Sequence, residues 1–284
     1  MSDAATATRH GDGAWRAAIF VCLIVLTTLF LLPILGVLFS SLKTTREISM
    51  GQLWSLPETL NLENFAEALG NPAVHTYFVN TLLIAIPATA VSIALGVLAG
   101  YVFSKLPFRG SNLLFLVIVS GMFFPPQVVL IPLFKLFNAL GLLDTLWPMI
   151  IVHIGMGIPI CTLLMRNFFA GVPNALREAA ILEGANELQF LVKVALPLSL
   201  PALAVLATLQ FTWIWNDFLW PLIFTQSDDK RTIMLGIAFL KGQYSVAWGI
   251  QGALSLVASL PTLVIFLFFQ RYFIKGMTMG AVKG

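Results

Sequence analysis

The sequence predicts an all-α integral membrane protein with six transmembrane helices. Of its 284 residues, 58% are hydrophobic and only 10% are charged, and the mean hydropathy is +0.91. Soluble domains carry roughly 25% charged residues, so this chain is too apolar for a soluble fold. The formal net charge is +3, and the basic residues are scattered, which indicates membrane topology rather than nucleic-acid binding.

Six charge-free runs are long enough to cross a membrane, for which a helix needs about 20 apolar residues. The second run is overlong, and we expect its first part to be a loop containing Asn71, Pro72 and His75. Arg9 and Arg16 precede the first run as in a signal peptide, but the run lacks a small-residue cleavage site, so an uncleaved span is expected. The runs cover residues 17–42, 68–104, 110–134, 145–165, 194–216 and 242–270.

The distribution of positive charge predicts that both termini are cytoplasmic. With that orientation, ten of the 16 lysines and arginines lie inside and six lie outside, in agreement with the positive-inside rule. The prediction is one transmembrane domain over residues 1–284, with two cytoplasmic tails, one external loop and one cytoplasmic loop between spans four and five. These four segments are residues 1–14, 274–284, 43–76 and 167–198.

The cytoplasmic loop carries a polar insert with clear helix signals. Pro173 is suited to a first helical turn, and Gly184 to the left-handed residue that ends a helix. Asn186 and Gln189 have the spacing of a capping box, and we expect Pro197 to stop the second helix. The loop should therefore fold as a helix, a glycine bend and a second helix.

Three other segments carry packing signals. Residues 64–69 should form a short helix on the outer membrane surface. Small residues recur every fourth position in the second span, which lets another helix approach closely. Pro125 and Pro126 are the strongest of several proline interruptions, because two backbone donors are lost together, and a static kink is expected rather than a broken helix. The small residues are Ala88, Ser92, Gly96 and Gly100.

Few residues suggest chemistry. No GxxxxGK[ST] pattern occurs, so this chain cannot bind nucleotide phosphates through a P-loop of its own. His10, His75 and His153 are isolated, with no spacing that would hold a metal, and His153 is expected to be a hydrogen-bonded packing residue. Cys22 and Cys161 lie in apolar segments and should be free thiols.

Asp217 is the one acid embedded in apolar sequence. An intramembrane carboxylate suggests a functional site, and aromatic and amide neighbours suit contact with a sugar. The alternative is interfacial anchoring or helix packing, and the tryptophans at 213, 215 and 220 fit the aromatic belt. A proton relay is disfavoured, because no second buried acid or base pairs with Asp217 in the sequence.

The polar insert resembles the EAA loop of ABC importer permeases. The loop pattern is E-A-A, three residues, G, nine residues, I, any residue, L-P, and this chain departs from it only by Val194 in place of Ile. Further matches indicate the maltose-type carbohydrate permeases, specifically the shorter, MalG-like channel subunit. They are Ser41 to Thr44, Trp215 to Leu222, Gly242 to Tyr244 with Trp248, Leu260 and Pro261, Phe269 to Tyr272, and Gly280 to Gly284.

The resemblance implies a MetI-like fold and roles for particular residues. Glu178, Ala179, Ala180, Gly184 and Pro197 would belong to the loop that inserts its amphipathic coupling helix into a cytoplasmic ATPase. The tail residues Gly280, Lys283 and Gly284 would reach the ATPase dimer, unless the tail is a disordered basic segment near anionic lipid. Candidate residues of the substrate pathway are Gln127, Trp213, Asn216 and Asp217.

The resemblance also implies the partners. They are a second, MalF-like permease, two MalK-like ATPases, an external or periplasmic solute-binding protein and membrane lipid, with no nucleic acid. The chain would not be an enzyme and would hold no cofactor, since ATP and Mg would be bound by the ATPases.

The implied function is alternating-access import of a sugar or sugar derivative across the cytoplasmic (inner) membrane of a prokaryote. Sugars, polyols, sugar phosphates and sulfonates all remain open as substrates. The alternatives are an ion-coupled carrier in which Asp217 or His153 titrates, and a membrane scaffold that does not transport.

Overall fold

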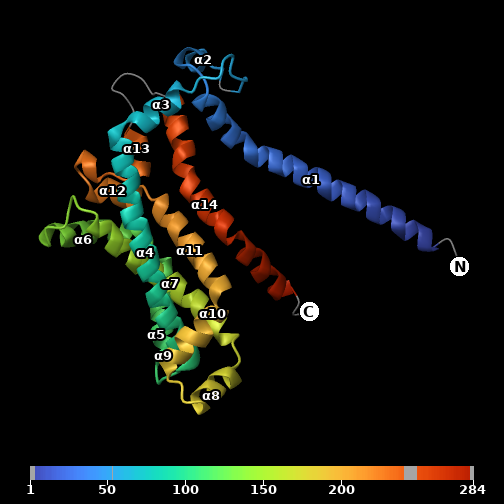
Figure 1. Cartoon of the computed structure of the whole chain (residues 1–284), viewed down its shortest axis with the longest axis vertical. Helices are drawn as coiled ribbons and strands as arrows, with labels where there is room; N and C mark the ends of the chain where they lie inside the picture. The colour runs from blue at the N-terminus through green and yellow to red at the C-terminus, as the bar shows by residue number, and fades with distance from the viewer. Residues whose placement is uncertain (1–3, 53, 240–247, 282–284) are drawn as a thin grey trace. The chain divides into compact units, whose positions relative to one another are not determined.

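All regular elements of the described chain are helical. The computed structural model describes residues 4–52, 54–239 and 248–281, and the side chains of residues 13, 15–52, 54–239 and 248–272. The α-helices are α1 Ala4–Ser41, α2 Thr45–Ser49, α3 Glu63–Gly70, α4 Pro72–Lys105, α5 Ser111–Ser120, α6 Pro126–Ala139, α7 Trp147–Ala170, α8 Asn174–Leu182, α9 Glu187–Phe190, α10 Leu196–Leu198, α11 Leu200–Trp215, α12 Leu219–Phe224, α13 Ile233–Phe239 and α14 Trp248–Ala281 (Figure 1). The first compact unit is Met1–Gly70 with Leu240–Val257, and the second is Asn71–Phe239 with Ala258–Gly284.

Four helices are long and apolar enough to cross a membrane, and two bent helix pairs raise the number to six. The four are Trp15–Ser41, Pro72–Lys105, Trp147–Ala170 and Trp248–Tyr272. The bent pairs, Ser111–Phe123 with Pro126–Ala139 and Glu187–Leu198 with Leu200–Trp215, cover the third and fifth predicted spans. The all-α class and six segments are thereby confirmed, although two of the segments are not straight.

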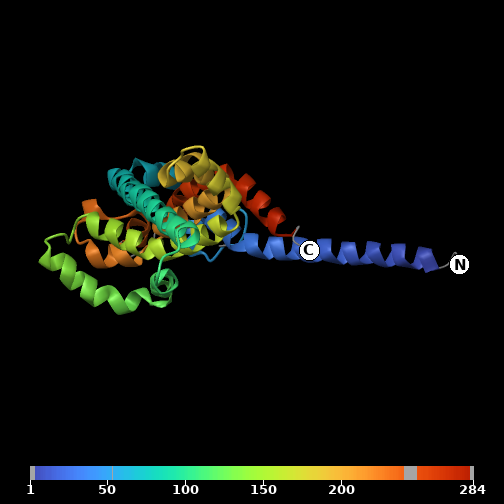
Figure 2. The same cartoon turned by 90° about the horizontal axis from the view of Figure 1, so that it is seen from below.

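The third segment is broken rather than kinked. Phe124 and Pro125 are extended, and the helices on either side differ in direction by 96°. The expected static kink was therefore wrong, although the predicted position of the break was right. Pro125 cannot donate to the preceding turn, and Pro126 disfavours a helical conformation in the residue before it. Figure 2 shows α6 diverging from α5 after this bend.

Close packing of α4 against α7 forms the centre of the second unit. A Cβ on Gly96 would lie 2.2 Å from Cβ of Cys161, and a Cβ on Gly100 would lie 2.7 Å from Cβ of Met165. Ala88 and Ser92, on the same stripe, are fully buried. The close helix approach predicted from the small residues is confirmed.

The start of α4 differs from the expectation. Pro72 and His75 lie in the helix rather than in a loop, because Asn71 caps α4 by accepting a hydrogen bond from the Ala73 amide at 3.0 Å. Pro72 follows at a first-turn position, where its missing N–H costs nothing.

In the first unit, hydrogen bonds hold the segment that follows α1 in place. Thr44 and Glu47 form a capping box at α2, and Asn64 of α3 donates to the carbonyls of Ser41 at 3.0 Å and Lys43 at 2.8 Å. Lys43 is fully buried and donates to Ser55 at 3.1 Å. The predicted helix at residues 64–69 is confirmed by α3. Cys22 and Cys161 are free thiols, as predicted.

Candidate functional site at the α8–α9 loop

The polar insert folds as the sequence indicated up to Gly184. Pro173 occupies the N-cap position, just before the first turn in which it was predicted, α8 follows from Asn174 to Leu182, and Gly184 has φ +90°. The amide of Gly184 donates to the Ile181 carbonyl at 2.9 Å, and the next amide, of Ala185, donates to the Ala180 carbonyl at 3.0 Å. These two bonds satisfy carbonyls that the end of a helix leaves free, in the manner of a Schellman cap.

The second helix begins as predicted but does not end at Pro197. Asn186 and Gln189 exchange two hydrogen bonds of 2.9 Å in a capping box. After α9 the chain forms a π-helical turn, Leu191–Ala195, and Pro197 lies inside the short α10 that follows. The wider π turn relieves the clash that a proline makes with the preceding helical turn. The direction changes by 77° at Ser199 instead.

The surface of α8 has two different faces. No residue of α8 is buried, and Glu178 and Ala179 are exposed together with Leu182, whose exposed fraction is 88%. Ala180 lies on the other face and packs against the hydrophobic cluster of the second unit. An exposed leucine between small and acidic residues, at the end of the unit where α4 finishes (Figure 1), is suited to a protein partner.

Polar contacts attach α8 to the rest of the second unit. Arg177 forms an ion pair with Glu187 of α9, and the Tyr101 hydroxyl of α4 donates to the same carboxylate at 2.6 Å. Lys105, at the end of α4, donates to the Val172 carbonyl and to Oδ1 of Asn174 at 2.8 Å. The hydrogen bond to Glu187 raises the pKa of the Arg177 guanidinium above its ordinary value, so Arg177 remains charged at any physiological pH.

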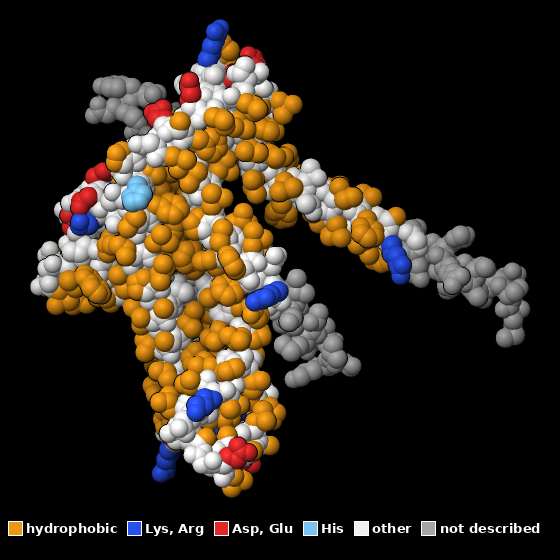
Figure 3. Space-filling model, viewed as in Figure 1, with side chains coloured by type: hydrophobic (Ala, Val, Ile, Leu, Met, Phe, Trp, Pro, Cys, Tyr) orange, Lys and Arg blue, Asp and Glu red, His pale blue; other side chains and the backbone are white. Residues whose placement is uncertain are grey.

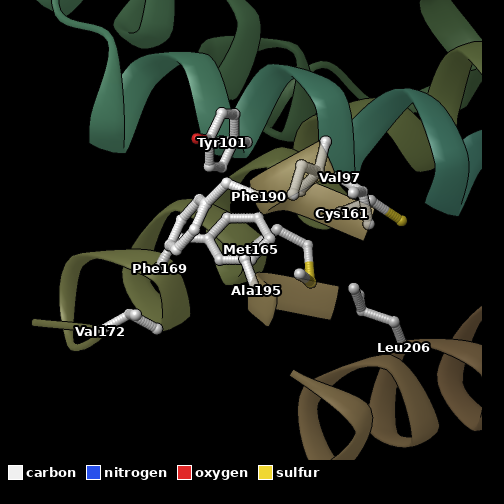
Figure 4. Close-up of a cluster of buried hydrophobic side chains, with 10 residues drawn as sticks. Val97, Tyr101, Cys161, Met165, Phe169, Val172, Phe190, Ala195 and Leu206 are labelled. Carbon is white, nitrogen blue, oxygen red and sulfur yellow. The ribbon is translucent and has the colours of Figure 1, made fainter. Parts of the chain in front are cut away.

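Tyr101 also belongs to a cluster of buried hydrophobic side chains (Figure 4). Tyr101 packs edge-on against Phe169, with ring centroids 5.7 Å apart, and lies beside Phe190. The cluster joins α4, α7, α9, the π turn and α11. Its buried members are Val97, Tyr101, Cys161, Met165, Phe169, Val172, Phe190, Leu191, Ala195 and Leu206.

Sequence reasoning missed Arg177, Glu187, Tyr101 and Lys105. The available signals were the opposite charges of Arg177 and Glu187 within one short loop and the two polar groups at the end of the second span. Neither signal predicts that these side chains meet, because Tyr101 and Glu187 are 86 positions apart in the sequence and only the fold brings them together.

Asp217 has a partner that the sequence did not reveal. Its Oδ2 lies 3.3 Å from Nε2 of His153 on α7, and its Oδ1 accepts from the Leu219 amide at 3.1 Å. The side chains of His153 and Asp217 are 11% and 13% exposed. The expectation that no base pairs with Asp217 was wrong, because the two residues meet only through the packing of separate helices.

The other candidate residues of the substrate pathway are not gathered at Asp217. Gln127 is exposed in the first turn of α6, Trp213 is 57% exposed, and Asn216 donates to the Thr212 carbonyl at 2.8 Å. Within the residues that the structure describes, no hydrogen bond or ion pair joins Gln127 to Trp213, Asn216 or Asp217.

Of the two alternatives to substrate contact, helix packing rather than the aromatic belt holds for two of the three tryptophans. Trp215 is fully buried, stacks on Phe211 and donates to the Ala258 carbonyl at 2.8 Å. Trp220 is 3% exposed and stacks on Phe224. Both side chains belong to the core of the second unit, because other parts of that unit pack against them.

The remaining candidate residues lie at the end of the chain. Gly280 lies in the last turn of α14, whereas Lys283 and Gly284 lie outside the described residues. Over the described ranges, no group of three or more His, Cys, Asp or Glu side chains could hold a metal ion.

The described chain is thus a multi-spanning helical protein that presents a capped, exposed helix between two candidate membrane segments. The chain belongs to the family of binding-protein-dependent transport system inner membrane components, whose family model matches residues 92–279. It is therefore a multi-pass permease subunit of an ABC importer.

Similar proteins are transport permeases. A probable ABC transporter permease protein of Pyrococcus horikoshii is 37% identical over 89% of this chain and 93% of its own length. The alpha-glucoside transport system permease protein AglG of Rhizobium meliloti is 35% identical over 80% of this chain and 62% of its own. A subunit of a bacterial ABC transporter involved in the import of the acidic polysaccharide alginate is 25% identical over 93% of this chain and 98% of its own, with a TM-score of 0.80.

Proposed function

We propose that this permease subunit imports a sugar or sugar derivative and is driven by ATPases that bind the exposed face of α8. The observation that carries the proposal is the solvent-exposed face formed by Glu178, Ala179 and Leu182 on a helix with no buried residue. A helix with no buried residue contributes little to the stability of its own protein, and a groove on a partner would bury the exposed side chain of Leu182. We call α8 the coupling helix.

ATP and Mg are bound by the two partner ATPases, since the sequence has no P-loop. The proposed assembly also contains a second permease and an external solute-binding protein, and the α8 end of the second unit faces the cytoplasm of a prokaryote. Figure 3 shows apolar side chains over the middle of the second unit and charged side chains at the α8 end. The support for the orientation is the excess of Lys and Arg on the predicted cytoplasmic side. Closure of the ATPases on ATP draws the coupling helices together and opens the pathway toward the binding protein.

The names of the relatives support a carbohydrate substrate. AglG is named for alpha-glucosides, and another relative, SmoH of Agrobacterium fabrum, is 30% identical over 93% of each chain and is named for sulfoquinovosyl glycerol. The neighbouring Asn216 and Asp217, with the exposed Trp213, provide groups that can bind hydroxyls and a sugar face.

The proposal is tested in the purified complex by reversing the charge at Glu178 and placing an acid at Leu182. We expect both substitutions to remove the ATPase from the complex and to abolish uptake and ATP hydrolysis stimulated by loaded binding protein. The matched control is charge reversal at Glu67, an exposed acid of α3 in the first unit. Wild-type uptake by the Glu178 and Leu182 variants, or uptake by this chain alone driven by an ion gradient, would contradict the proposal.

A further inference from the structure

One carboxylate, that of Glu187, joins three helices at the α8 end of the second unit. Arg177 of α8 binds it through two nitrogens, with Nε 3.1 Å from Oε2 and a second, shorter contact from a terminal nitrogen to Oε1. The Tyr101 hydroxyl of α4 donates to Oε2 at 2.6 Å. Glu187 itself is the first residue of α9. A bidentate arginine contact fixes orientation as well as distance.

The attachment is rigid on one side and weak on the other. Tyr101 is 3% exposed and is held between Phe169 and Phe190 in the hydrophobic cluster. On the other side, the coupling helix has no buried residue, and Ala180 alone among its residues packs against the cluster. Apart from its covalent connections to α7 and α9, the coupling helix is therefore joined to the membrane helices mainly by polar contacts.

We propose that Glu187 is a positioning residue that transmits displacement of the coupling helix to α4, by binding Arg177 and Tyr101 with one carboxylate. This inference rests on the proposed function, since it requires that an ATPase moves the coupling helix. Arg177 directly precedes Glu178, so a force applied to the exposed face of the coupling helix acts next to the ion pair between Arg177 and Glu187. The shared carboxylate makes α8, α9 and the end of α4 move as one body.

Two neighbouring contacts define what Glu187 adds. Both are made by Lys105, which donates hydrogen bonds to the Val172 carbonyl and to Oδ1 of Asn174, the first residue of α8. These contacts hold the start of α8, whereas Arg177 and Glu187 lie on either side of the Gly184 bend. Among the described residues, the Glu187 carboxylate therefore joins α8, α9 and α4 at a single point.

The substitution that tests the proposal most cleanly is Tyr101→Phe, which removes the hydroxyl and keeps the packed ring. In proteoliposomes containing the whole complex, we expect solute uptake per ATP hydrolysed to fall by at least about tenfold, the lower end of the equilibrium equivalent of one hydrogen bond to a charged group. The ATPase should still copurify in wild-type amount. Glu187→Gln, which retains the shape, should also lower the ratio, and Arg177→Lys should restore part of what Arg177→Met loses.

The second unit contains a matched control at the other end of α4. Tyr77 is 5% exposed, and its hydroxyl donates to Asp228 at 2.7 Å, so Tyr77→Phe removes an equivalent bond between a tyrosine and a carboxylate. Tyr77→Phe should retain the wild-type ratio of uptake to hydrolysis. A wild-type ratio in Tyr101→Phe, or additive effects of Tyr101→Phe and Arg177→Met, would overturn the inference while leaving the proposed function intact. Failure of the proposed function would instead appear as wild-type behaviour of the Glu178 variants.

A distance measurement keeps the test decisive if transport is lost altogether. Spin labels at Ala175 of α8 and at the half-exposed Leu98 of α4, with the exposed Cys22 replaced by Ser, report the separation of the two helices. On ATP binding the separation should stay constant in the otherwise native complex and should shift or broaden in the Tyr101→Phe complex. An unchanged distribution in Tyr101→Phe overturns the inference.

Discussion

Replacing Gly184 by alanine tests the coupling loop through its backbone alone. Gly184 has φ +90°, and a Cβ there would meet nothing within 4 Å, so the substitution adds no clash. An L-residue in the left-handed region costs about 1–2 kcal/mol. The free loop can relax by fraying the end of α8, whereas a bound ATPase requires the native bend, so the strain is expressed on binding. Affinity for the ATPase should fall by a factor of about 5–30, measured by titrating ATPase onto the purified permease pair.

Gly141 provides a control with the same geometry. It ends α6 with φ +66°, its amide donates to the Asn138 carbonyl at 3.0 Å, and the next amide donates to the Phe137 carbonyl at 2.9 Å. Gly141→Ala therefore introduces the same backbone strain at the predicted external side and should leave ATPase affinity unchanged. Asparagine at position 184 should bind better than alanine, because it tolerates the left-handed region. Wild-type affinity of Gly184→Ala would refute the reasoning.

Three further predictions concern packing and charge. Gly96→Ala should lower the melting temperature of the complex, since its Cβ would lie 2.2 Å from a neighbouring carbon and overpacking costs about 1–3 kcal/mol, whereas Gly155→Ala, with nothing within 4 Å, should not. Hydrogen bonds from the loop after α12 hold the pKa of Asp144 below its ordinary 3.8, so its stabilisation is complete above that pH and is lost as pH falls through the lowered value. The amides of Gln226 and Ser227 donate to Asp144, and their hydrogen exchange, corrected for intrinsic rates, should accelerate only at a pH below 3.8. Acceleration at a higher pH would contradict this prediction. His153→Ala should lower the melting temperature of the complex, because it removes a largely buried ring whose Nε2 lies 3.3 Å from Oδ2 of Asp217. In thermal unfolding, the His153→Ala, Asp217→Asn double variant should lose less than the sum of the single variants, and additivity would count against the contact.

Local signals account for what could be predicted from the sequence. Helix ends depend on residues within one or two turns, so Gly184 and the Asn186 capping box were identified correctly. The small residues around Gly96 recur at a fixed spacing along one helix, which predicts close approach of another helix without identifying that helix. Long apolar runs likewise reveal spans without any knowledge of their neighbours.

The errors concern contacts and conformations that arise from tertiary packing. Pro197 does not stop its helix, because the π turn before it widens the backbone. Trp215 is in the core because other helices cover it, whereas the sequence alone leaves anchoring at the membrane interface and helix packing both open. Tyr101 and Glu187 meet across 86 positions, and no periodicity links them. These contacts are specified by the fold as a whole, and they include the ones on which transmission from the coupling helix depends.

Cross-linking from the most exposed position of the coupling helix tests the central claim directly. A photoreactive amino acid replacing Leu182, which is 88% exposed, should cross-link in native membranes to a protein that contains a P-loop and hydrolyses ATP. The same group at Leu60, 78% exposed in the first unit, should not yield that product. Identification of the ATPase at position 182 alone is the predicted result. Cross-links from position 182 to lipid only, or to the ATPase from both positions equally, would contradict the account.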